Sequence, residues 1–208
     1  MATRGKHGLW QWGRTAQTQR ALLDAARQVF TEHGFTEANI ADIVERAGSS
    51  VGSLYHHFGG KGELFIALWQ EHQLSHEVAS RMAVADAKKN GVTDPAQLFE
   101  TGTRAFLNDS WEQRDLVLLF HSGDAPAGFE LMRRAKVSDW LNQNDSLLHL
   151  TDTPVDRMYA SILTSVIREG VDAISLAKSR EQADEIINAL IGFIRRLMSG
   201  GPWRPDSE

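Results

Sequence analysis

The chain has no cysteine and only five prolines among its 208 residues. The absence of cysteine excludes disulfides, thiolate-bound zinc and a thiol nucleophile. No segment approaches the roughly 20 consecutive apolar residues that cross a bilayer, and the first residues lack the apolar run of a secretion signal. We therefore expect a cytoplasmic protein with no membrane association, no metal site and no cofactor.

Excess positive charge is also lacking, since the formal net charge is −5. Residues 1–60 are the less acidic part, because they hold six Lys and Arg against five Asp and Glu. Four basic residues precede the first acid, Asp24: Arg4, Lys6, Arg14 and Arg20. Two interpretations remain open for these residues: an arm and first helix that face the DNA phosphates, or a solvated tail.

Apolar residues recur at the three-and-four spacing of helices, and no long alternating strand pattern is present. The predicted helices cover residues 18–33, 40–47, 51–56, 61–87, 95–108, 111–121, 129–150, 155–178 and 180–199. The sequence therefore predicts an all-α protein of about nine helices.

Residues 39–58 have the signals of two short helices that flank a tight turn. Asn39 is a good N-cap for a helix that ends at Gly48, and Ser50 is a good N-cap for the next one. The apolar residues of this stretch form one inward face, and small or polar residues remain outside. This pattern is typical of a helix-turn-helix DNA reader.

This stretch resembles the heads of the tetracycline-repressor (TetR) family of bacterial regulators. The resemblance rests on Gly34, Phe35, Ile43, Ala47, Gly48, Ser50, Gly52, Leu54, Tyr55, His56, His57, Phe58 and Lys61. The sequence departs from the family pattern at Ser49, where Val is usual, at Val51, where a basic or polar residue is common, and at Gly62, where an acid is common.

The resemblance implies a three-helix DNA-binding head, a larger helical body that binds a small molecule, and a homodimer. The expected organisation is a flexible basic arm (1–17), the DNA-binding domain (18–60), the ligand-binding and dimerisation domain (61–200) and a tail (201–208). The expected partners are a palindromic duplex operator and a small-molecule effector. The expected DNA contacts are Asn39, Ser50, Val51, Ser53, Tyr55, His56 and Lys61, with His57 in a structural role and Lys61 on phosphate.

Two further sets of residues are predicted in the body. Aromatic residues with two polar neighbours lie where helix signals are broken, and they are candidates for a ligand cavity: Phe99, Arg104, Phe106, Trp111, Phe120, His121 and Trp140. The last two helices have more apolar positions than one inward stripe needs, which predicts a four-helix dimer interface: Ile162, Val166, Gly170, Ile187, Ile191, Gly192 and Ile194. Plain monomer core remains the alternative for both sets.

His72 and His76 have a spacing that can hold a metal, but no third ligand signature accompanies them, and we expect a pocket-lining or solvated pair. No nucleophile or acid–base motif points to an enzyme. The predicted function is a ligand-responsive transcriptional regulator that releases its operator when an effector binds. The alternative is a ligand-independent DNA-binding regulator or activator.

Overall fold

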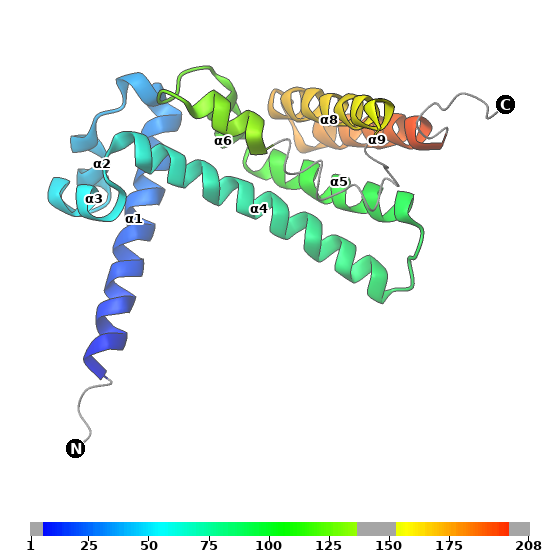
Figure 1. Ribbon diagram of the computed structural model, residues 1–208. Helices are drawn as coiled ribbons and strands as arrows, with labels where there is room; N and C mark the ends of the chain where they lie inside the picture. Colours follow the sequence, from blue (N-terminus) through cyan, green and yellow to red (C-terminus); the bar gives the residue numbers. More distant parts are fainter. Residues whose placement is uncertain (1–5, 137–152, 200–208) are drawn as a thin grey trace. The chain divides into compact units, whose positions relative to one another are not determined.

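The computed structural model describes residues 6–136 and 153–199, and only the backbone of residues 6–14. Within these ranges every regular element is a helix, which confirms the predicted fold class. Residues 129–136 are also helical. The labelled helices of Figure 1 are α1 (Lys6–Glu37), α2 (Ile40–Arg46), α3 (Val51–Phe58), α4 (Lys61–Lys89), α5 (Pro95–Glu112), α6 (Arg114–His121), α8 (Pro154–Ser175) and α9 (Arg180–Ser199).

Helix α1 is longer than the sequence predicts, because it begins at Lys6 and includes residues 6–17 of the expected arm. Gly8 and Gly13 lie in this part, and glycine weakens any helical signal by about 1 kcal/mol relative to alanine. Near its other end the helix is interrupted at Gly34, whose φ is 78°. A backbone with this positive φ favours glycine, so the predicted stop at this residue coincides with a true break.

Contacts divide the chain into two units. The first unit consists of residues 1–71 and 119–127, and the second consists of residues 72–118 and 128–208. The division falls within α4, after Glu71, whereas the sequence places the domain boundary before residue 61. The short segment 119–127 also joins the first unit, although it is distant from the head in the sequence.

The first unit has a core that joins α1, α2, α3 and the start of α4. Its fully buried side chains are Leu22, Ala26, Val29, Phe30, Ile43, Leu54, Leu64 and Phe65. The Phe65 ring contacts Phe30 edge to face at 5.4 Å between centroids, and it contacts Phe120 in the same way at 5.2 Å. Edge-to-face aromatic contacts add to the free energy of burial, so segment 119–127 is part of this core.

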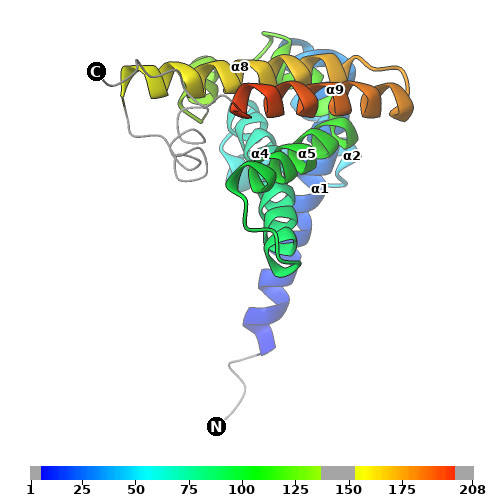
Figure 2. The same ribbon diagram turned by 90° about the vertical axis from the view of Figure 1, so that its right-hand side faces the viewer.

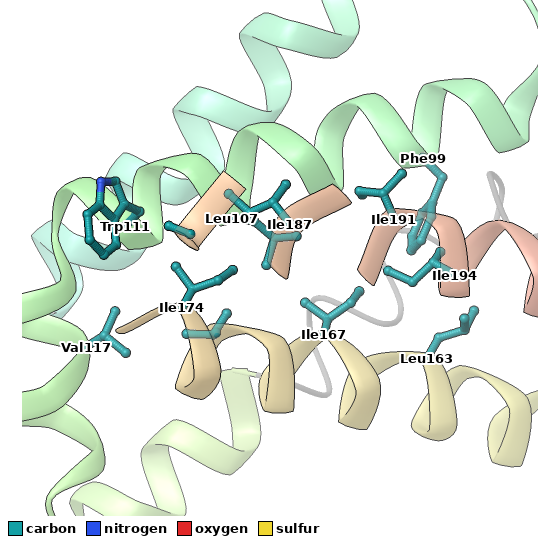
Figure 3. Packing of buried hydrophobic residues seen from close by; sticks show 12 residues of the cluster. Phe99, Leu107, Trp111, Val117, Leu163, Ile167, Ile174, Ile187, Ile191 and Ile194 are labelled. Atoms are coloured by element: carbon teal, nitrogen blue, oxygen red, sulfur yellow. The ribbon is translucent and has the colours of Figure 1, made fainter. Parts of the chain in front are cut away.

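The second unit is built on α8 and α9, which lie side by side and antiparallel in both ribbon views (Figures 1 and 2). Helix α5 packs against both of them. Figure 3 shows the resulting core, whose side chains come from all three helices: Phe99, Leu107 and Trp111 of α5, Leu163, Ile167 and Ile174 of α8, and Ile187, Ile191 and Ile194 of α9. Such interdigitated aliphatic packing fixes the positions of these helices.

Local signals set where the helices of the second unit begin. Thr153 and Asp156 form a capping box around Pro154 at the start of α8, and Asp94 caps α5 just before Pro95. Proline suits the first helical position because an N–H at that position would have no acceptor within the helix, so its absence costs nothing. No described helix is both long and apolar enough to span a membrane.

Candidate nucleic-acid interface

Helices α2 and α3 are capped at their N-terminal ends by the residues that the sequence indicates. Asn39 Oδ1 accepts a hydrogen bond from the Ala41 N–H at 3.0 Å, and Ser50 Oγ accepts one from the Ser53 N–H at 3.2 Å. The turn between the helices contains Gly48, whose φ is 58°. Asn39 and Ser50 therefore define the start of each helix, whatever else they contact.

Helix α3 has one buried and one exposed side. Leu54 is fully buried and attaches the helix to the core. Val51 is 47% exposed and Tyr55 is 52% exposed; these two residues are one turn apart. His56 is also exposed, while Ser53 and His57 are half-buried. The structure therefore gathers Val51, Tyr55 and His56 of the predicted DNA contacts at the surface of one helix.

Lys61 has a different environment from the one that the sequence predicts. Its Nζ donates hydrogen bonds to the carbonyl oxygens of Phe35 at 2.8 Å, Thr36 at 3.0 Å and Ala38 at 2.9 Å. It also lies 4.8 Å from the centroid of the Phe35 ring. A lysine ammonium has three N–H donors, so all of them are used within the head. In this arrangement Lys61 holds the end of α1, and a phosphate contact would require breaking one of these bonds.

Asp124 also holds the end of α1, through hydrogen bonds to Thr36. Its carboxylate accepts hydrogen bonds from the Thr36 N–H at 3.0 Å and from the Thr36 hydroxyl. These bonds, together with the nearby Lys61 charge, hold the pKa of Asp124 below its usual value. A Cβ at Gly34 would lie 2.5 Å from Asp124 Oδ2, so a larger residue there would displace this carboxylate in addition to straining the backbone at its positive φ. The sequence offered no signal for this contact because Asp124 lies 88 residues from Thr36.

Basic side chains of the head are partly engaged in ion pairs. Arg20 pairs with Asp24 at 2.7 Å and also with Glu71, so its charge is balanced within the first unit. Arg46 of α2 makes two parallel hydrogen bonds to Glu32 of α1, at 2.8 and 2.6 Å. Arg4 lies outside the described residues, and the side chains of Lys6 and Arg14 are outside them as well. A phosphate contact by Arg20 would therefore require breaking these ion pairs.

The two histidines of α4 form a buried network in the second unit. His76 Nδ1 lies 2.7 Å from Asp109 Oδ2, and His72 Nδ1 lies 3.3 Å from Gln113 Oε1. Burial alone would raise the pKa of Asp109, but hydrogen bonds from His76, Ser75 and Gln113 outweigh this effect and lower it. Both histidines are only 4% exposed, so the expectation of a solvated pair is wrong. Among the described residues, no group of three or more potential ligands could hold a metal.

The predicted ligand-contacting residues are divided between the two units. Phe99 and Trp111 belong to the core of the second unit, whereas buried Phe120 and exposed His121 belong to the first unit. Phe106 is half-buried, with its ring 4.7 Å from that of His76. Arg104 donates a hydrogen bond to Asn188 at 2.8 Å, and Trp140 lies outside the described residues.

The predicted dimer residues require a correction. Ile187, Ile191 and Ile194 are at most 2% exposed, so they form this chain's own core and offer no surface to a partner. Gly170 is also buried, and a Cβ there would lie 2.2 Å from Leu190 Cδ2, so its close contact is with α9 of the same chain. Ile162 is 45% exposed, Val166 and Gly192 are half-buried, and a Cβ at Gly192 would meet nothing. The wide apolar face of α9 arises because α5 and α8 both pack on it.

Comparison with known proteins agrees with this architecture. Residues 22–68 match the family model for bacterial regulatory proteins of the tetR family. The chain is 24% identical to the HTH-type transcriptional repressor AcnR of Corynebacterium glutamicum over 86% of this chain and 93% of that protein. It is 26% identical to the HTH-type transcriptional regulator CymR of Pseudomonas putida over 94% of this chain and 84% of that protein.

A solved structure, the fatty acid degradation regulator FadR from Bacillus halodurans, has the same fold, with a TM-score of 0.67 and 21% identity over 89% of this chain and 99% of that one. The helix-turn-helix head and the helical second unit define a DNA-binding transcriptional regulator. The head of the chain, residues 22–68, matches the tetR family, which confirms the resemblance predicted from its sequence.

Proposed function

We propose that the protein is a homodimeric repressor that releases its operator when a small molecule binds the second unit. The observation that supports it most is the exposed side of α3, where Val51, Tyr55 and His56 stand at the surface of a capped helix in a helix-turn-helix head. Repression is favoured because a relative that spans most of the chain, AcnR, is named a repressor. We further propose that it acts in the cytoplasm.

The need for a dimer follows from affinity. A single short helix makes too few contacts for tight, specific binding, so two heads on half-sites one DNA turn apart are expected. Helices α8 and α9 carry exposed apolar side chains that could serve as the contact: Met158 is 57% exposed, Ile162 is 45% exposed and Phe193 is 46% exposed. Met158 and Ile162 lie one turn apart on α8. We place the interface on these residues.

The proposed effector site lies in the second unit, near Phe106 and the buried polar network. Phe106 contacts both the hydrophobic core and the His76 ring, so this region offers apolar surface beside hydrogen-bonding groups. Such a mixture is typical of small-molecule sites. Helix α4 belongs to both units, and it provides a covalent route by which an effector could change DNA affinity.

The proposal can be tested with a duplex selected from a random-sequence pool by the full-length protein. We expect an enriched palindrome that binds two chains, with affinity that falls steeply as salt rises. Small apolar compounds that raise the melting temperature should then weaken binding to this duplex. Because coupling is reciprocal, the duplex must weaken compound binding by the same factor.

Two outcomes would contradict parts of the proposal. A pool that shows no enrichment would exclude sequence-specific DNA binding by this chain. An enriched duplex whose affinity no stabilising compound changes would instead favour the alternative of a ligand-independent regulator or activator.

A further inference from the structure

The recognition helix and its flanks lack the side chains that most often identify bases. Between Ala47 and Gly60 the sequence has no Arg, Lys, Asn or Gln. Arg and Lys make paired hydrogen bonds to guanine, and Asn and Gln make them to adenine, so α3 cannot use either contact. Sequence selectivity from this helix must therefore depend on single hydrogen bonds and on apolar contact.

Val51 occupies the position where an apolar contact can be made. It is the first residue of α3, and the N-terminal residues of a recognition helix are those that reach base edges. Nearly half of its surface is exposed although its two methyl groups gain nothing from water. The adjoining Gly52 has open space where a Cβ would be, since no atom of the described residues, apart from its chain neighbours and the backbone of its own helix, lies within 4 Å of that position.

The hydroxyl beside Val51 is already engaged. Ser50 Oγ accepts the hydrogen bond from the Ser53 N–H that caps α3, so turning this side chain toward DNA would cost the cap, typically about 1 kcal/mol. Tyr55, one turn further along, has its ring exposed beside Val51 on the same helix side. At the N-terminal end of α3, the exposed methyl groups of Val51 therefore lie next to Gly52, which has no side chain.

We infer that Val51 recognises the C5 methyl group of a thymine in each half-site. Thymine is the base that presents a methyl group in the major groove, and apolar side chains identify it by this contact. Val51 is then the residue that determines specificity at this base pair. The inference deepens the proposed function and rests on it, since it requires that α3 enters the groove.

The test uses the duplex selected by the wild-type protein, with each enriched thymine replaced in turn by uracil, which lacks only the methyl group. At one position we expect uracil to weaken wild-type binding about fourfold when it replaces thymine in one half-site, and about fifteenfold when it does so in both. Each replacement removes the burial of one methyl group. The Val51→Ala variant should bind the thymine duplex more weakly and should not respond to uracil at that position. Val51→Thr, which keeps one methyl group, should retain part of the response.

The outcomes separate this inference from the proposed function. A selected duplex whose affinity is unchanged by every uracil substitution contradicts the role of Val51 and leaves sequence-specific binding intact. An equal uracil response in the wild type and in Val51→Ala contradicts it too, because another residue must then contact the methyl group. A pool without any enriched sequence contradicts the proposed function itself.

Discussion

Nε2 of His72 lies 3.0 Å from Nε2 of His76, one turn along α4. Two unprotonated ring nitrogens would repel each other at this distance, so one proton lies between them. On the other side of each ring, His72 Nδ1 faces Gln113 Oε1 and His76 Nδ1 faces the Asp109 carboxylate, so both side chains join the histidine pair in one hydrogen-bonded network.

This network predicts that Asp109→Asn lowers the free energy of unfolding at pH 7 by about 2 kcal/mol, because the half-buried carboxylate loses its charged hydrogen bonds to buried His76 and to Ser75 and Gln113. Asp109 has a lowered pKa in the folded state. Its contribution is therefore complete above the unfolded-state pKa of about 4 and is lost as the pH falls through the folded-state value. Urea unfolding between pH 7 and pH 3 measures both effects.

The control for Asp109→Asn is Glu45→Gln, which removes an exposed carboxylate from α2. We expect this variant to keep the wild-type dependence of stability on pH, whereas Asp109→Asn should have a shallower fall below pH 4. Identical slopes for the two variants would show that the Asp109 carboxylate has no special stabilising role.

Lys61→Ala should destabilise the head without changing the number of phosphate contacts. The ammonium group binds three carbonyl oxygens, and removing it leaves them without this donor, which costs on the order of 2 kcal/mol. Thermal unfolding measures the loss, and exposed Lys88→Ala is the matched control. The slope of log affinity against log salt should remain that of the wild type; a slope reduced by about 1 would instead place Lys61 on a phosphate.

Phe193→Glu and Ile162→Glu should produce folded monomers, because both side chains are exposed on α9 and α8 and a charge there opposes apolar contact with a second copy. Leu74→Glu, at an exposed apolar position of α4, is the matched control and should remain dimeric. Sedimentation velocity at micromolar concentration distinguishes the species. If Ile162→Glu and Phe193→Glu both remain dimeric, the interface lies elsewhere on the protein.

Ile191→Glu has a different expected result, since this residue is 2% exposed in the core of its own chain. A charge buried there without a partner costs several kcal/mol, so the variant should lose cooperative unfolding. Circular dichroism during thermal unfolding is the measurement. A stable, folded Ile191→Glu monomer would restore the sequence-based view that this residue faces a partner.

The helix-turn-helix head could be predicted from the sequence because its signals are local. Asn39, Gly48 and Ser50 lie within one short stretch, and each determines the backbone conformation at its own position. Caps and glycine turns depend on side chains within a few residues, so their pattern is visible without knowledge of the fold.

The contacts that the sequence could not predict are all long-range. Asp124 reaches Thr36 and Asp109 reaches His76 across 88 and 33 residues, respectively, and no spacing rule links such pairs. The assignment of Ile187 and Ile191 failed for a related reason. A wide apolar face on a helix indicates two neighbours, but it does not indicate whether they come from the same chain or from a partner.

The central claim is that the exposed side of α3 reads DNA, and the affinity ratio between the selected duplex and a scrambled duplex tests it most directly. Fluorescence anisotropy at fixed salt should give a ratio of at least about 1,000 for the wild type. Tyr55→Ala should reduce this ratio at least tenfold, while Gln28→Ala, at an exposed position of α1, should leave it unchanged. A Tyr55→Ala protein that is folded and keeps the wild-type ratio would contradict the claim.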